Sequence, residues 1–371
     1  MDIGKRLKHA RERASLRQED VAAKTDIGMS SLSDFENGKR TPRMHQLEAL
    51  AKLYNRSVSF FFEEGPVAME RVLWRQKPAA EVAAEVETRF LLLCEQYHNL
   101  EVWCDRKRYC SLPSGEPPSG GEFDVQAAKA LARQTLRGLD LGERPGRNLL
   151  RVLEEVCGVK VFHMDFDPAG CAACVVGSFG SAVLLNSRNV RWRRNFDLAH
   201  ELFHLLTWKV FRKETAAVNC EPSPLEEKLA GVFASNLLLP PETTRNAIEV
   251  LAENRILQFA DVEDIARQFD VSAEALIYQM AWIYDLKPEW GRKAVEEYRT
   301  FAAWLEPRTR EDEKPPLRPE RFRALAIEAL RKGEVAAGRF AEYMGISRTE
   351  SLRYLEGLED AGHEQIDFTP A

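Results

Sequence analysis

The chain has 371 residues, of which 44% are hydrophobic and 30% are charged, and this is enough for two or three folded domains. Its formal net charge of −6 excludes a protein that coats nucleic acid over its whole surface, so any contact with DNA must be local. Because no apolar run approaches 18 residues and the cysteines number seven, we expect no membrane span or signal peptide, reduced thiols and a cytoplasmic protein.

Residues 1–62 have the pattern of a compact helical unit. Ser15 is the expected N-cap of a second helix, with Gln18 and Glu19 in its first turn. A third short helix follows and is expected to end at Asn37-Gly38. Two short helices joined by a turn predict a helix-turn-helix domain, which we assign to residues 1–65.

This segment resembles the XRE-type (Cro and phage-repressor) family through Gln18, the run F-E-N-G-K-R-T-P at 35–42 and the helix at 44–54. The resemblance implies a five-helix domain whose third helix enters the major groove of duplex DNA. The implied contacts are with bases from Ser30, Ser31 and Ser33, and with phosphates from Gln18, Lys39 and Arg40. Because acidic and basic residues nearly balance here, the alternative is a module for protein–protein contact or homodimer formation.

The rest of the chain mixes helical and extended patterns. Residues 66–110 are expected to form a helical connector, and a turn-rich loop follows at 112–121. Alternating apolar residues predict three short strands at 159–164, 174–177 and 181–186. A charged, proline-rich linker at 301–319 precedes a helical, helix-turn-helix-like unit at 320–371. The expected fold is mainly α with a small β-sheet, that is, α+β.

The strongest chemical signal is the pattern H-E-x-x-H. His200 and His204 are four residues apart in a stretch of helical composition, so both imidazoles leave one face of the helix. Glu201 projects beside that face, where it can take a proton from a water molecule activated by zinc. A second amphipathic helix follows, and Glu226 or Glu227 in its first turn is the third ligand that a catalytic two-histidine zinc site needs.

Residues 196–206 and the later run E-x-x-A-x-x-F-A-x-x-L-L-x-P together resemble the ImmA/IrrE family of zinc endopeptidases. The resemblance implies a zincin-like metallopeptidase domain at 111–300. It places the third Zn²⁺ ligand on Glu227, beside the two histidines, and it makes Glu201 the catalytic base.

The resemblance also implies that an extended substrate pairs with an edge of the small sheet, for which 170–179 is the best candidate. The chain departs from the family in two places. Gly231 stands where the family usually has Asn or Asp, and Trp208 stands near a position that often holds a further His. A hydrogen bond to a zinc ligand is therefore either missing or supplied elsewhere.

Four further residues are weaker candidates. A thiolate of Cys171 or Cys174 would block the open zinc position and hold the enzyme inactive, with Cys171 preferred; the alternative is packing of small residues in a strand. His163 and Tyr278 are candidates for stabilising the oxyanion of the reaction.

A DNA-reading module joined to a protease indicates a regulator rather than a digestive enzyme. ImmA/IrrE-type proteases cleave a helix-turn-helix repressor, and the resemblance therefore implies such a substrate and a role in DNA-damage response or anti-phage defence. Single-stranded DNA is a candidate activator, because a basic and aromatic cluster precedes the zinc helix: Arg188, Arg191, Trp192, Arg193 and Arg194. The alternative for this cluster is a solvated helix start. The alternative for the whole protein is an XRE-family transcription regulator whose peptidase-like domain senses a ligand.

Overall fold

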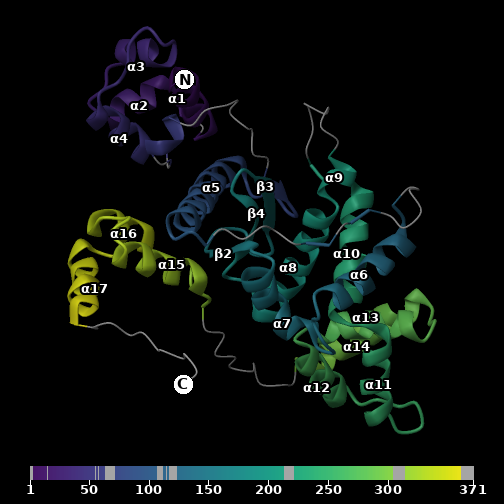
Figure 1. The fold of residues 1–371 in the computed structure, drawn as a ribbon. Coiled ribbons are helices and arrows are strands. Elements are labelled where there is room, and N and C mark those ends of the chain that lie inside the picture. Colours follow the sequence, from purple (N-terminus) through teal and green to yellow (C-terminus); the bar gives the residue numbers. More distant parts are fainter. Residues whose placement is uncertain are drawn as a thin grey trace. The chain divides into compact units, whose positions relative to one another are not determined.

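The computed structural model describes residues 3–14, 16–54, 56, 58–62, 72–106, 112, 113, 115, 116, 123–212, 221–303 and 314–360. Ser15, much of the 112–121 loop and most of the 301–319 linker lie outside these residues. The described part is mainly helical with one small sheet, which confirms the expected fold class (Figure 1). Within it, no helix is both long enough and apolar enough to cross a membrane.

The chain forms two compact units. The first combines Met1–Val67, Thr88–Tyr109 and Arg318–Ala371, and the second combines Ala68–Glu87 with Cys110–Leu317. Helix α5 (Ala80–Trp103) contributes its beginning to the second unit and the remainder to the first.

The first unit begins with the helix-turn-helix domain. Its elements are α1 (Ile3–Arg13), α2 (Gln18–Lys24), α3 (Met29–Glu36), α4 (Met44–Leu53) and a 3-10 helix (Val58–Phe62). Helix α2 begins three residues after the expected cap at Ser15. Its start is fixed instead by the Asp20 carboxylate, which accepts a hydrogen bond of 2.7 Å from the backbone N–H of Arg17. Helix α3 ends as expected, because Gly38 has a φ of +70°, which a helix cannot continue.

The remaining helices of the first unit are α15 (Glu320–Arg331), α16 (Ala337–Met344) and α17 (Arg348–Asp360). They pack on the later part of α5. The rings of Tyr97 and Phe322 meet edge to face with centroids 5.4 Å apart, and Arg321 Nη1 lies 2.5 Å from a carboxylate oxygen of Glu101.

The second unit contains a four-stranded sheet in the order β1-β3-β4-β2. Its strands are β1 (Leu73–Trp74), β2 (Lys160–Met164), β3 (Ala172–Gly177) and β4 (Gly180–Asn186). Strands β2 and β4 are parallel, and the other pairs are antiparallel.

Strand β1 corrects two expectations. The connector at 66–110 is not helical throughout, because Leu73 and Trp74 pair with Cys174 and Ala173 as a strand. Pairing buries both side chains, at 1% and 7% exposure, and this offsets the helical spacing of the segment. Strand β1 covers β3 only along Ala172–Cys174, so residues 170–179 are not a free edge throughout. Among the described residues, no strand pairs with Val175–Gly177 on this side, and substrate pairing there stays a prediction.

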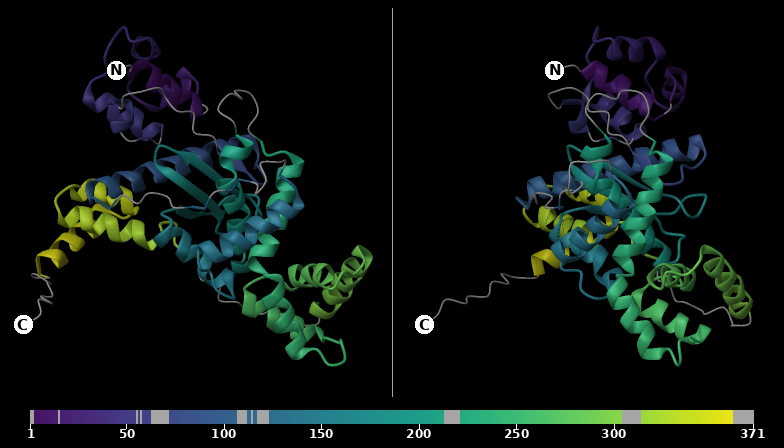
Figure 2. Two further views of the ribbon diagram at one scale, coloured as in Figure 1. Left: turned by 45° about the vertical axis from the view of Figure 1, so that its right-hand side comes forward. Right: turned by 90° about the vertical axis from the view of Figure 1, so that its right-hand side faces the viewer.

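The other elements of the second unit are helices. They are α6 (Val125–Gly138), α7 (Pro145–Arg151) with a π-helical turn (Val152–Val156), α8 (Arg191–Leu206), α9 (Trp208–Phe211), α10 (Pro224–Leu238), α11 (Pro241–Leu251), α12 (Phe259–Phe269), α13 (Ala273–Ile283) and α14 (Pro288–Ala302). Helix α8 packs on β3 and β4 and also on α10, so it lies between the sheet and α10 (Figures 1 and 2).

The end of α8 is closely approached by another segment. A Cβ atom at Gly115 would lie 2.3 Å from the carbonyl oxygen of Leu206, so only glycine fits there. Helix α8 contributes Leu198, Ala199, Leu202, Phe203, Leu205 and Leu206 to the core of this unit, and it also carries the site described next.

Candidate metal centre

Helix α8 holds the two histidines of the H-E-x-x-H pattern. His200 and His204 are buried, at 2% and 1% exposure, with ring centroids 5.1 Å apart. The spacing of four residues brings both rings to one face of the helix. Packing of the neighbouring Phe203 against Phe233 of α10, with centroids 5.6 Å apart, turns this face toward the second helix.

Helix α10 brings a glutamate to the same point. Its start is fixed by the Ser223 hydroxyl, which accepts a hydrogen bond of 3.1 Å from the backbone N–H of Glu226. One oxygen of Glu227 lies 3.2 Å from Nε2 of His200, and the other lies 3.3 Å from Nε2 of His204. The ligand atoms of these three residues lie within 4.8 Å of one another.

The donor atoms fit a bound cation. Both Nε2 atoms, one oxygen of Glu227 and both oxygens of Glu201 are buried without a hydrogen-bond partner among the described residues. Buried polar atoms are rarely left unpaired, and here they occur together. Two imidazoles and one carboxylate around a common point are the ligands of a catalytic zinc ion with an open fourth position.

Burial and charge act differently on the members of the group. Burial lowers the pKa of His200 to about 4 and raises the pKa of Glu201 to about 7. Burial opposes ionisation of Glu227, but its contacts with both histidines lower its pKa to about 2. For His204, burial also favours the neutral form, whereas Glu226 and Glu227 outweigh it and raise the pKa to about 9.

Glu226 contacts the ring nitrogen of His204 that does not face the donor group. Its Oε1 lies 2.8 Å from Nδ1 of His204, and Arg212 holds the same oxygen at 2.7 Å. One of the two histidines thus has a polar partner, although Gly231 has no side chain to provide one and its Cβ position has no neighbouring atom within 4 Å. Adjacent residues of a helix point about 100° apart, so of Glu226 and Glu227 only one faces the donor cluster.

A buried ion-pair network lies one turn before Glu201 and was not predicted from the sequence. Asp197 is fully buried and forms an ion pair with Arg75, which follows β1. Its carboxylate also lies 3.1 Å from Nε of Arg193 and accepts a hydrogen bond of 2.9 Å from Nδ2 of Asn189. The signal in the sequence was Asp197, which stands four residues before Glu201 in the expected helix. A carboxylate that is buried needs partners, but the sequence does not identify the residues that supply them.

The two cysteines are buried, and neither belongs to the donor group found among the described residues. The thiol of Cys174 lies close enough to Glu201 that the carboxylate raises the pKa of the thiol and the thiol acts to lower the pKa of the carboxyl group. Among the described residues, neither oxygen of Glu201 accepts a hydrogen bond of ordinary geometry. Cys171 lies near Asp197 instead. Burial raises the pKa of both thiols, and the proposed cysteine block stays a prediction.

The two oxyanion candidates lie on separate elements. His163 is buried on β2, the strand beyond β4 from β3, and pairs with Leu185. Tyr278 is 50% exposed on α13, where its ring faces Gly291 of α14. Neither is a member of the donor group.

The basic cluster does not precede the zinc helix as expected, because all its members except Arg188 lie in the first turn of α8. All four arginines of the cluster have partners. Arg188 pairs with Asp165 and Asp167, and Arg191 lies 2.7 Å from Asp270. Arg193 contacts Asp197, as described above, and Arg194 donates to the backbone oxygen of Asn189. These contacts neutralise much of the cluster, which weakens it as a phosphate-binding surface.

The helix-turn-helix residues differ in their freedom. Ser30, Lys39 and Arg40 are exposed, whereas Ser31 and Ser33 are half-buried. The amide of Gln18 donates a hydrogen bond of 2.9 Å to Glu36, which also forms an ion pair with Arg11. The hydrogen bond to Glu36 therefore already orients the Gln18 side chain that is expected to contact phosphate.

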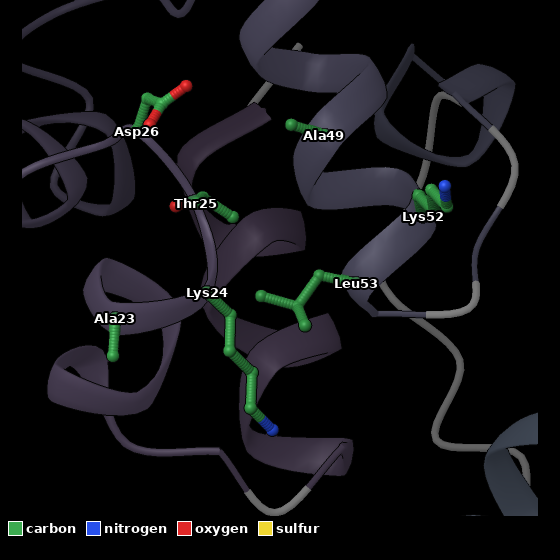
Figure 3. A pocket seen from close by; sticks show the side chains of 7 residues that line it. All are labelled: Ala23, Lys24, Thr25, Asp26, Ala49, Lys52 and Leu53. Carbon is green, nitrogen blue, oxygen red and sulfur yellow. The ribbon is translucent and has the colours of Figure 1, made fainter.

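A pocket of this domain lies between the end of α2 and α4 (Figure 3). Its lining residues are Ala23, Lys24, Thr25, Asp26, Ala49, Lys52 and Leu53. None of the proposed DNA-binding residues lines it, so the pocket and the third helix are separate features of the surface.

The fold and the site define a helix-turn-helix domain joined to an α+β domain with a His-His-Glu cluster. Comparison with known proteins agrees: residues 2–59 match the family described as a helix-turn-helix domain, and residues 154–280 match the IrrE N-terminal-like domain. The chain thus carries an XRE-type helix-turn-helix domain at its N-terminus and an IrrE-like domain after it.

One curated relative is the HTH-type transcriptional regulator ImmR of Bacillus subtilis (strain 168). It is 38% identical over 68 residues, which are 18% of this chain and 54% of the relative. The match therefore spans about half the length of that relative.

Proposed function

We propose that this protein is a zinc-dependent endopeptidase that cleaves a helix-turn-helix transcriptional repressor. The observation that carries the proposal is the convergence of His200, His204 and Glu227 on one point, with Glu201 buried beside them. The match of residues 154–280 to the IrrE N-terminal-like domain supports the same class of reaction.

In this proposal His200, His204 and Glu227 hold the zinc ion. Zinc, when bound, polarises the scissile carbonyl and lowers the pKa of a water molecule. Glu201 accepts the proton of the attacking water and then donates it to the leaving amine. Glu226 fixes the ring of His204 through Nδ1, so that Nε2 stays directed at the zinc position.

The proposed substrate follows from the pairing of the two domains. A helix-turn-helix domain next to a peptidase suits a regulator, and the similarity to the regulator ImmR supports such a setting. The resemblance to ImmA/IrrE proteases implies cleavage of a repressor in the cytoplasm after a DNA-damage or phage-related signal, and hence derepression of a stress or defence operon. Single-stranded DNA is the candidate activator, and duplex DNA is the candidate ligand of the helix-turn-helix domain.

The decisive experiment compares new protein termini in cells that express the wild-type chain or its Glu201→Gln variant, before and after DNA damage. We expect one new cut in a helix-turn-helix protein, present only with the wild-type chain and only after damage. A cut that persists at full rate with Glu201→Gln would contradict the role of Glu201. A cut that appears without damage would contradict the proposed signal.

The second candidate is an XRE-family DNA-binding regulator that uses the peptidase-like domain as a sensor. The similarity to ImmR favours this alternative, because the matched protein is described as a transcriptional regulator. Sequence-specific binding to an operator, with no Glu201-dependent cleavage in either state, would establish it in place of the protease.

A further inference from the structure

The two histidines of the donor group are supported in different ways. Nδ1 of His204 contacts Glu226 at 2.8 Å, which is the usual arrangement for a metal-binding histidine. Nδ1 of His200 is buried and has no hydrogen-bond partner among the described residues. Something other than a hydrogen bond from the described residues must therefore orient the ring of His200.

The neighbour of that ring on the helix is Phe196. The two ring centroids are 6.4 Å apart, with the planes tilted by 39°. On Phe196 lies the guanidinium of Arg75, 5.0 Å from the ring centroid. An arginine over an aromatic ring is attracted to it, more strongly where water is displaced, and the Arg75 side chain is only 15% exposed. Arg75, Phe196 and His200 thus form a continuous row of side chains.

Arg75 is itself held at both ends. Its backbone N–H donates a hydrogen bond of 3.0 Å to the carbonyl of Ala172 in β3, which continues the pairing of β1. Its guanidinium forms the ion pair with Asp197, whose position is fixed by Asn189. A side chain anchored in this way can fix the position of the ring beneath it.

We propose that Arg75 is a positioning residue for the metal centre, acting through Phe196 to orient His200. The inference rests on the proposed metal-dependent function. It adds a part of the site from outside the segment that matches the IrrE-like domain, since that match begins at residue 154. The segment formed by β1 and Arg75 accordingly contributes to the metal centre as well as to the sheet.

Charge and orientation predict opposite effects of removing Arg75. Arg75 carries a positive charge near the site, so its loss would tighten the binding of a divalent cation if charge were its only effect. If Arg75 orients His200, its loss weakens binding, because loss of a partner that orients a ligand typically costs 10- to 100-fold in metal affinity.

The test measures Co²⁺ binding to the chelator-treated full-length protein, using the visible absorption of Co²⁺ to follow affinity and ligand geometry. We expect Arg75→Ala and Phe196→Leu each to weaken binding about tenfold or more and to change the spectrum. Arg75→Lys keeps the charge but lacks the planar guanidinium, so it should lose less Co²⁺ affinity than Arg75→Ala. The double variant should bind no more weakly than Phe196→Leu alone, because both changes break the same row.

Two variants serve as references. Glu226→Gln removes the support of His204 and should weaken binding, whereas Arg292→Ala removes an exposed arginine paired with Glu289 and should bind like the wild type. Circular dichroism of each variant checks folding, and Phe196→Leu keeps the Arg75–Asp197 pair if Arg75→Ala should unfold.

Unchanged or tighter binding by Arg75→Ala, with the spectrum preserved, would overturn the inference and leave the proposed zinc site standing. Additive losses in the double variant would overturn the route through Phe196. Failure of the wild-type protein to bind Co²⁺ at all would instead overturn the proposed function on which the inference rests.

Discussion

At the scale of single residues, the site depends on how each donor is held. His204 is fixed by a carboxylate, Glu226, which Arg212 and the cap of α10 hold in turn. Glu226 and Glu227 are neighbours in the sequence but have different partners. Glu226 contacts Nδ1 of His204, whereas Glu227 lies near the Nε2 atoms of both histidines.

The first prediction at this scale concerns Glu226. Replacement by Gln keeps the shape but removes the charge that favours hydrogen bonding from Nδ1 of His204. We expect zinc affinity to fall by about 10- to 100-fold, measured by competition with a chromogenic chelator. The same replacement at Glu221, an exposed glutamate just before α10, should leave the zinc affinity unchanged.

A second prediction concerns stability and pH. His163 is 8% exposed, and burial, with a smaller effect of Arg194, lowers its pKa to about 4 from the ordinary 6.5. The unfolded chain therefore binds more protons between pH 6.5 and 4, so the folded state loses stability as the pH falls through this range. Relative to His163→Gln, the wild-type free energy of unfolding should drop by about 2 kcal/mol between pH 7 and 5.

Urea unfolding at several pH values, followed by tryptophan fluorescence, gives this comparison. All other titrating groups are common to both proteins and cancel in the difference. Parallel stability curves for the two proteins would show that His163 is protonated as easily in the folded chain as in the unfolded one.

At the scale of elements, the short strand β1 matters more than its length suggests. It adds only Leu73 and Trp74 to the sheet, but both are buried and the following residue reaches Asp197. Trp74 also packs against Phe166 and donates a hydrogen bond of 2.7 Å to Glu87 of α5. The segment 73–75 is therefore held by contacts of three consecutive side chains.

The prediction for this element is a loss of stability on truncation of Leu73. Leu73→Ala leaves a cavity in the core around α8 and should lower the free energy of unfolding by about 2 to 4 kcal/mol. The matched control is Val250→Ala at a residue that is 82% exposed, where a change within about 0.5 kcal/mol is expected. Equal effects of the two changes would mean that β1 is not part of the folded core.

At the scale of the whole molecule, the helix-turn-helix domain and the donor cluster belong to different compact units. The three donors come from α8 and α10, so a metal ion that binds them joins two helices of the second unit. The first unit holds none of these donors.

Metal removal should therefore act on one unit. With free Zn²⁺ at about 100 times its dissociation constant, binding stabilises the second unit by about 2.7 kcal/mol. Scanning calorimetry with and without a chelator should move the transition of that unit and leave that of the first unit in place. A variant with both His200→Ala and His204→Ala should be insensitive to the chelator, and a response that it retained would place the metal elsewhere.

The sequence by itself determined the local parts. A four-residue spacing fixes His200 and His204 on one helical face, and Asn37-Gly38 ends α3 because the backbone there must leave the helix. The fold class also followed, since periodicity of apolar residues is a local property of the chain. Local signals could not indicate that residues 73–74 form a strand, because a strand of two residues exists only where a partner such as β3 pairs with it.

Only the tertiary structure decided how the cluster is supported. Arg75 and Asp197 are 122 residues apart, and their pairing follows from the register of β1 on β3 and the packing of α8 on the sheet. The division of roles between Glu226 and Glu227 likewise depends on the rotation of α10 against α8. Contacts between distant segments depend on packing and burial, and these forces act only once the chain has folded.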